Sequence, residues 1–134
     1  MRLYVVFLVS FLLFPFPLSA ADIPATLKRV IDGDTAVMQT SDGEKTVRFK
    51  GIDTPELKGR CAAEKQAARR AKAATERLLS KGAITLQKPS RDKYGRTAAF
   101  VLVDGKPVHV ALIRAGHGRA YAGGKRQGWC DGQN

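Results

Sequence analysis

The alternation of apolar and polar residues predicts a chain built mainly from β-strands. Several short segments are rich in β-branched residues and change character roughly every second position, as strands with one buried face do. A turn signal at Ser41-Asp42-Gly43 separates two of these segments, and another at Asp104-Gly105 follows the last one. We therefore expect five strands, at residues 25–31, 35–40, 45–52, 83–87 and 97–103.

Two segments have helical character instead. Residues 61–80 are rich in Ala, Lys, Arg and Glu, lack Gly and Pro, and are followed by Gly82, a typical residue after a helix end. Residues 107–115 begin with Pro and precede Gly116, which predicts a short second helix. The long helix is expected to pack through small residues on one face, namely Ala62, Ala63, Gln66, Ala67, Arg70, Ala73, Ala74 and Leu78.

Five short strands, with a helix after the third and another after the fifth, predict an α+β fold that is mainly β. A small closed or partly open barrel suits this order of elements. Residues 118–134, rich in glycine and basic residues, are expected to be irregular. The length of 134 residues allows one ordinary domain, which we assign to residues 22–134.

The first 21 residues have the pattern of a secretory signal peptide. Arg2 is followed by a mostly apolar run from Leu3 to Phe14, and small residues at positions 19–21 form a cleavage site after Ala21. An uncleaved membrane anchor is the alternative, because the apolar stretch nearly reaches the about 20 residues that span a bilayer. With the signal removed, we expect an exported protein, periplasmic or secreted, with no stable membrane association.

The charge of the chain narrows the class of partner. The sequence has 23 Lys and Arg residues against 12 Asp and Glu residues, a net charge of +11. A small domain this basic is expected to bind polyanions such as nucleic acid, although a basic surface can also serve solubility alone. The long helix has a basic face, formed by Lys65, Arg69, Lys72, Arg77 and Lys81. This face would add non-specific attraction to phosphates, or would simply be solvated.

Two cysteines, Cys61 and Cys130, lie outside the predicted signal peptide. In an oxidising compartment an even number of cysteines favours a disulfide. This bridge would close a loop of about 70 residues, worth about 4 kcal/mol on a chain-entropy estimate. A metal site that combines the cysteines with His109 or His117 is the alternative, without supporting spacing.

Three clusters carry candidate chemistry. They are Asp32-Gly33-Asp34-Thr35 between two strands, Arg48 with Asp53-Thr54-Pro55-Glu56 at the end of the third, and Asp92-Lys93-Tyr94-Gly95-Arg96 before the fifth. Turn and capping chemistry can explain an individual Asp at such positions. Carboxylates that gather in a basic chain also favour a hard cation, Ca²⁺ or Mg²⁺. An EF-hand is excluded, because Gly43 stands where its bidentate Glu would be, counting from Asp32.

Arginines complete a set suited to phosphodiester hydrolysis. The negative charge that develops on the non-bridging oxygens of a phosphodiester is matched better by planar guanidinium groups than by ammonium groups. A metal held by carboxylates, two arginines and a further carboxylate that acts as a base are the parts that this reaction needs.

In order, the motifs VIDGDT, RFKGIDTPE and DKYGR resemble those of the staphylococcal nuclease family. The resemblance extends from Ala25 to about Tyr121. It implies a five-stranded OB-fold Greek-key barrel with two to three helices. It also implies Ca²⁺-dependent cleavage of DNA and RNA with little sequence specificity, leaving 3′-phosphate ends.

The resemblance assigns a metal site to four residues of this chain. Asp34 and Asp53 match carboxylates that bind one Ca²⁺ ion, and Thr54 matches a residue that offers its backbone carbonyl. Asp32 matches an acid that reaches the metal through water.

Catalytic and substrate-binding roles follow in the same way. Glu56 matches the carboxylate that orients or deprotonates the attacking water, and Arg48 and Arg96 match the arginines that hold the scissile phosphate. The matches for substrate contacts are Lys93, Tyr94 and Tyr121. The family's second pocket tyrosine is replaced by Gly123, so a different nucleotide pocket is expected.

Two other functions stay open at this point. An OB-type protein can bind single-stranded nucleic acid without cleaving it. Retention of both the acidic cluster and the arginines favours the enzyme, because carboxylates repel phosphate when no metal is bound. A membrane-active cationic protein is disfavoured, because the long helix has Ala where a bulky apolar face would be needed. We expect a monomer.

Overall fold

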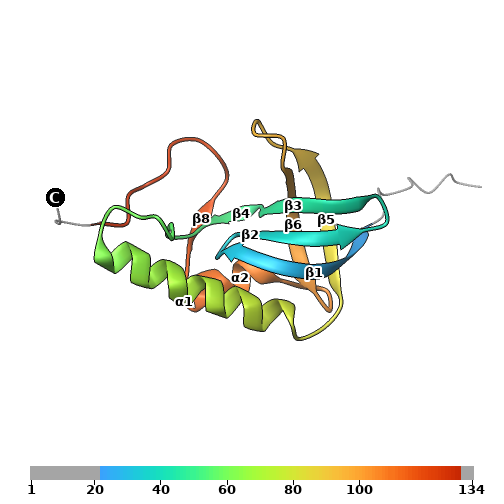
Figure 1. The fold of residues 1–134 in the computed structure, drawn as a ribbon, viewed down its shortest axis with the longest axis horizontal. Helices are drawn as coiled ribbons and strands as arrows, with labels where there is room; N and C mark the ends of the chain where they lie inside the picture. Colours follow the sequence, from blue (N-terminus) through green and yellow to red (C-terminus); the bar gives the residue numbers. More distant parts are fainter. Residues whose placement is uncertain (1–21, 131–134) are drawn as a thin grey trace, which may run out of the picture.

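The structure, a computed structural model, describes residues 22–130 (Figure 1). The predicted signal peptide, residues 1–21, and residues 131–134 lie outside the described part. The helices are α1 (Ala62–Leu79) and α2 (Val108–Arg114). The strands are β1 (Ile23–Asp32), β2 (Thr35–Thr40), β3 (Gly43–Phe49), β4 (Gly51–Asp53), β5 (Ile84–Arg91), β6 (Thr97–Val103), β7 (Lys106–Pro107) and β8 (Arg119–Tyr121).

Five strands form a closed barrel, which confirms the predicted fold class. β1, β2 and β3 form an antiparallel meander, and β1 also pairs with β5, which pairs with β6. A parallel pairing of β3 with β6 closes the sheet. The alternating inward residues of these strands form the core, with Met38, Val47, Phe49, Leu86 and Val101 almost fully buried. The short β4 and β8 form a separate two-stranded sheet beside the barrel.

The prediction of one continuous strand over residues 45–52 was wrong. The chain leaves the barrel at Lys50, so that β3 pairs with β6 whereas β4 pairs with β8. Gly51 makes this bend possible because its φ of +87° lies in the left-handed region that favours glycine. A side chain at Gly51 would also meet the His109 ring at 2.7 Å.

The prediction of an entirely irregular tail was wrong as well. Residues 119–121 form β8, which pairs with β4 in antiparallel register, Gly51 with Tyr121 and Asp53 with Arg119. Three residues are too few to show alternation. After β8 the chain first rises away from α1 and then turns back to the N-terminal end of this helix (red in Figure 1).

The long helix exists as expected, but it packs through a different face. Its buried residues are Glu64, Ala68, Ala71, Ala74, Thr75 and Leu79, whereas Ala62, Ala63, Gln66 and Arg70 of the predicted face are exposed. The buried stripe contains a Glu and a Thr whose polar groups find partners in the fold, so it does not look apolar in the sequence. None of the helices within residues 22–130 is long and apolar enough to cross a membrane.

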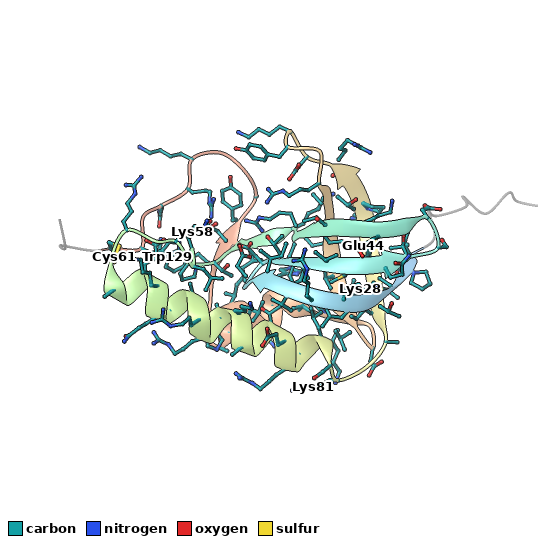
Figure 2. All side chains as sticks on the ribbon, in the orientation of Figure 1. Lys28, Glu44, Lys58, Cys61, Lys81 and Trp129 are labelled. Atoms are coloured by element: carbon teal, nitrogen blue, oxygen red, sulfur yellow. A yellow bond between two sulfur atoms is a disulfide. The ribbon has the colours of Figure 1, made fainter. Side chains whose placement is uncertain are left out.

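The disulfide prediction is confirmed. Cys61 and Cys130 are bridged, with their Cα atoms 6.1 Å apart (Figure 2). Cys61 is also the N-cap of α1, where its sulfur accepts a hydrogen bond from the backbone N–H of Glu64. The bridge therefore joins the tail to the start of the long helix. Because both sulfurs are in the bridge, the alternative metal site with a histidine is wrong.

Candidate active site

The predicted metal-binding carboxylates come together where β1 ends, β2 begins and β4 ends. Asp34 lies in the β1–β2 turn and Asp53 is the last residue of β4. Both are buried, with 4% and 3% of their surface exposed. One oxygen of Asp34 accepts a hydrogen bond of 2.9 Å from the backbone N–H of Thr54 and the other accepts one from the Thr35 hydroxyl. Residues twenty positions apart are thereby joined into one site.

Tight packing against α1 holds the β1–β2 turn. The hydroxyl of Thr75 on α1 donates a 2.7 Å hydrogen bond to the carbonyl of Gly33. A side chain at Gly33 would lie 2.8 Å from the Cβ of Ala71 and 2.9 Å from the side chain of Thr54. Asp32, at the end of β1, accepts a hydrogen bond from the backbone N–H of Asp34. It lies beside the buried pair, half-buried itself.

Arg48 connects the two buried carboxylates. Its Nη2 lies 3.2 Å from an oxygen of Asp34 and 3.7 Å from an oxygen of Asp53. Its Nη1 donates hydrogen bonds to the carbonyls of Phe49 and Ile52, at the bend between β3 and β4. The bend that divides the predicted strand thus also fixes this arginine. The guanidinium stands between the carboxylates and the adjoining cleft, which it helps to line.

The buried carboxylates fit an oxygen-ligated cation. Burial raises the pKa of Asp34 to about 6, even though the positive charge of Arg48 lowers it. Asp34 and Asp53 present oxygens to one atom of Arg48, so these oxygens converge on a common region. Carboxylate and carbonyl oxygens are the ligands that Ca²⁺ and Mg²⁺ take.

Glu56 lies in the segment between β4 and α1, at the edge of the buried pair. Its side chain is 47% exposed, and one oxygen accepts a 2.6 Å hydrogen bond from Arg126. The buried carboxylate of Glu64 fixes the backbone here, accepting hydrogen bonds from the N–H groups of Glu56 and Arg60. Glu64 thus couples the position of Glu56 to the first turn of α1.

A cleft of about 640 Å³ adjoins the carboxylates and brings the remaining predicted residues together. Its lining includes both predicted phosphate-binding arginines and all three predicted substrate-binding residues, Arg48, Arg96, Lys93, Tyr94 and Tyr121. Phe100 and Lys50, which the sequence interpretation did not select, also line it. In Figure 1 the β5–β6 connection and the segment after β8 rise on the same side of the molecule, and residues of both line this cleft.

Asp92 organises the β5–β6 connection. It accepts hydrogen bonds from the backbone N–H groups of Tyr94 and Arg96, and a 2.7 Å bond from the Arg96 guanidinium. Burial raises the pKa of Asp92, but the bonds from Arg96 outweigh burial, and the pKa is lowered. Tyr94 is 72% exposed, with the guanidinium of Arg96 over its ring. The sequence interpretation quoted Asp92 without giving it this positioning role.

Arg126 is the main site residue that sequence interpretation missed. Its Nε donates a 2.7 Å hydrogen bond to Asp53, and its Nη2 bonds Glu56. A signal was present, because Arg126 precedes Cys130 by four residues and Glu56 precedes Cys61 by five. The predicted disulfide therefore brings the two within reach, since a residue spans at most about 3.6 Å.

Comparison with known proteins agrees with this geometry. A family model described as staphylococcal nuclease homologue matches residues 46–129. The matched range contains Arg48, Asp53, Glu56 and Arg96, and begins after Asp34.

Three relatives have names that indicate nucleases. The SPbeta prophage-derived endonuclease YokF of Bacillus subtilis (strain 168) is 36% identical over 100 residues, which cover 72% of this chain and 34% of that protein. Endonuclease YncB of the same organism is 37% identical over 97 residues, covering 70% of this chain and 46% of that protein. The thermonuclease of Staphylococcus intermedius is 32% identical over 111 residues, covering 79% and 66%.

The chain thus spans between about a third and about two thirds of the length of these relatives. The barrel, the three motifs in order and the family match lead to the same conclusion: the chain belongs to the family of staphylococcal nuclease homologues.

Proposed function

We propose that this protein is an exported, Ca²⁺-dependent nuclease that hydrolyses phosphodiester bonds of DNA and RNA and leaves 3′-phosphate ends. One observation carries the proposal. Two buried carboxylates, of Asp34 and Asp53, converge on Arg48 at the edge of a cleft that Arg96 also lines. The relatives named endonuclease and thermonuclease support the same reaction class.

The metal would be held by the side chains of Asp34 and Asp53 and by the backbone carbonyl of Thr54, with Asp32 acting through water. When bound, Ca²⁺ would neutralise phosphate charge and polarise the scissile phosphodiester. Ca²⁺ tolerates flexible oxygen coordination, which suits a site assembled from a turn and a strand end.

The side chains of the protein would supply the remaining chemistry. Glu56 takes a proton from the attacking water, whose oxygen bonds to phosphorus while the bond from phosphorus to the 5′-oxygen breaks. Arg48 and Arg96 hold the non-bridging oxygens, where negative charge develops. Arg96 stabilises the departing 5′-oxygen by donating a hydrogen bond to it, and this oxygen takes up a proton from solvent water to become a hydroxyl. The products are a 3′-phosphate and a 5′-hydroxyl.

Low sequence specificity follows from the kind of groups in the cleft. Lys93 would contact phosphate, while the rings of Tyr94 and Tyr121 offer flat surfaces to sugars or bases. Tyr121 also donates a hydrogen bond from its hydroxyl to the Gly124 carbonyl, so its ring has a fixed place in the cleft wall.

Export and the monomeric state belong to the same proposal. The Cys61–Cys130 bridge supports an oxidising compartment, periplasmic or extracellular, as the place of action. The predicted signal peptide at residues 1–21 would direct the chain there, leaving residues 22–134 as one functional domain.

The direct test is cleavage of single-stranded DNA and of RNA by the purified protein, with Ca²⁺, with Mg²⁺ and with excess chelator. The proposal requires cleavage with Ca²⁺, none with chelator, and 3′-phosphate ends on the products. Binding of nucleic acid without cleavage under every condition would instead identify a non-catalytic OB-fold protein.

A further inference from the structure

The guanidinium of Arg126 contacts two carboxylates of the proposed reaction, those of the proposed metal ligand Asp53 and of the proposed general base Glu56. Its Nε is 2.7 Å from an oxygen of Asp53, and its Nη2 is 2.6 Å from an oxygen of Glu56. The same oxygen of Asp53 lies 3.7 Å from Arg48. The side chain of Asp53 is buried, whereas that of Arg126 is 44% exposed. Arg126 thus closes the solvent side of a carboxylate whose other side faces Arg48.

The tail holds Arg126 in this place from both directions. Before it, the Tyr121 hydroxyl bonds the Gly124 carbonyl. After it, Arg119 donates a 2.8 Å hydrogen bond to the Gly128 carbonyl and lies over the Trp129 ring at 3.7 Å. The Cys61–Cys130 disulfide then ties the tail to α1, and Figure 2 shows Cys61 and Trp129 together at the start of this helix.

A guanidinium and a metal ion would compete for Asp53. Both are cations that need the carboxylate of Asp53, and each repels the other at short distance. A guanidinium stays charged at every physiological pH, and Arg126 donates hydrogen bonds to the carboxylates of Asp53 and Glu56. It therefore cannot leave Asp53 by losing a proton.

We propose that Arg126 is the resident counter-ion of the candidate metal site, which a divalent cation must displace from Asp53 to bind. The strength of the Arg126 contact then sets the metal concentration at which the site fills. The disulfide contributes by holding Arg126 close to Asp53, where it competes with the metal. This inference rests on the proposed function, because it takes Asp34 and Asp53 to be metal ligands.

The test is titration calorimetry of Ca²⁺ into the metal-free purified protein. Arg126→Gln removes the competing charge and should tighten Ca²⁺ binding roughly three- to fivefold, the change expected from loss of a partly exposed ion pair of up to about 1 kcal/mol. Lys125→Gln is the matched control: it removes the same charge one residue earlier, and within residues 22–130 Lys125 forms no ion pair. It should change the affinity less than about twofold.

A second variant tests the role of the tether. The double variant Cys61→Ser, Cys130→Ser frees the tail, so it should also tighten Ca²⁺ binding. The serine hydroxyl at position 61 can still cap α1, which preserves the start of the helix. Adding Arg126→Gln to this double variant should have a smaller effect than in the bridged protein.

The possible outcomes separate the two proposals. Wild-type protein that binds no Ca²⁺ would refute the metal site and, with it, this inference. Wild-type protein that binds Ca²⁺ with the same affinity as Arg126→Gln would refute this inference alone, and so would equal effects of Arg126→Gln and Lys125→Gln.

Discussion

Gly33 is the residue where the proposed metal site depends most directly on missing side-chain volume. A Cβ there would lie 2.8 Å from the Cβ of Ala71 and 2.9 Å from two atoms of Thr54. Gly33→Ala should therefore push the turn away from α1 and lower the free energy of unfolding by about 1–3 kcal/mol, as overpacking does. Urea denaturation measures this change. The displaced turn should also weaken Ca²⁺ binding, because Asp34 is the next residue.

Gly128→Ala is the control for this prediction. Nothing lies within 4 Å of the Cβ it would carry. Its unfolding free energy should stay close to that of the wild type. A Gly33→Ala protein as stable as the Gly128→Ala protein would show that the turn can move without cost.

Glu56 is the residue whose chemistry can be removed with the least change in shape. Glu56→Gln keeps the size of the side chain and an oxygen that can accept the bond from Arg126, but loses the basic carboxylate. Turnover should fall by about 10²–10⁴-fold, the usual effect of losing a general base. Steady-state kinetics measure turnover, and binding of a non-cleaved oligonucleotide should persist. Glu44→Gln, on the exposed far end of the barrel in Figure 2, should leave turnover unchanged.

Sequence reasoning identified residues that form short local motifs and missed those placed by the fold. The acidic residues of the site lie at or just after strand ends, and the strand patterns beside them predict these positions: Asp32, Asp34, Asp53 and Glu56. Arg126 reaches Asp53 only through the tail and the disulfide, across 73 positions. Such a contact has no local pattern. Glu64 was missed for another reason, because a charged residue is not expected on the buried side of a helix.

Among the elements, α2 has a titratable group whose burial affects stability. His109 packs on Phe100 with their ring centroids 5.3 Å apart and also lies against Gly51. Burial lowers the pKa of His109 below its usual value of 6.5. The ammonium of Lys50, 6.0 Å from the Phe100 ring, adds a positive charge on the same wall.

The sign of the resulting pH dependence follows from proton binding. Below the pKa of the unfolded chain, unfolded His109 binds more protons than folded His109, so protonation favours unfolding. The contribution of neutral His109 to the free energy of unfolding is complete above about pH 6.5 and is lost as the pH falls below this value. His109→Gln removes it.

Urea denaturation at about pH 7.5 and about pH 5.5 should therefore show a larger stability loss on acidification in the wild type than in His109→Gln. Asp34 also titrates in this range, but it is common to both proteins and cancels in the comparison. Equal losses in the two proteins would contradict the prediction.

The positions of helices and strands were predicted well where a regular pattern runs through the whole element. They were predicted poorly where a few residues determine a bend or a buried face. The strand at 35–40 and the strand at 97–103 have their observed bounds. The break at Lys50 escaped prediction because a glycine within a strand-like run does not show that the residues after it pair with a different strand. The face of α1 was misjudged because hydrogen bonds formed by Glu64 and Thr75 make a polar stripe suitable for burial.

For the whole molecule, the disulfide is a covalent constraint that closes a long loop. Its cysteines are 69 positions apart, and on a chain-entropy estimate this closure stabilises the fold by about 4 kcal/mol. Reduction should lower the free energy of unfolding by about that amount, measured by urea denaturation with and without reductant. Cleavage should persist, because the bridge touches neither Asp34 nor Arg48. Reductant should leave the stability of the Cys61→Ser, Cys130→Ser variant unchanged.

The pairing that closes the barrel also governs when the site comes into existence during folding. β3 meets β6 through Val47 and Thr97, and β4 meets β8 through Gly51 and Tyr121, so both contacts join distant parts of the chain. Contacts of this kind form slowly, because long loops must close first. Asp34, Asp53 and Arg48 converge only after these steps. An unfolded chain in transit therefore has every side chain of the proposed nuclease and none of its active geometry.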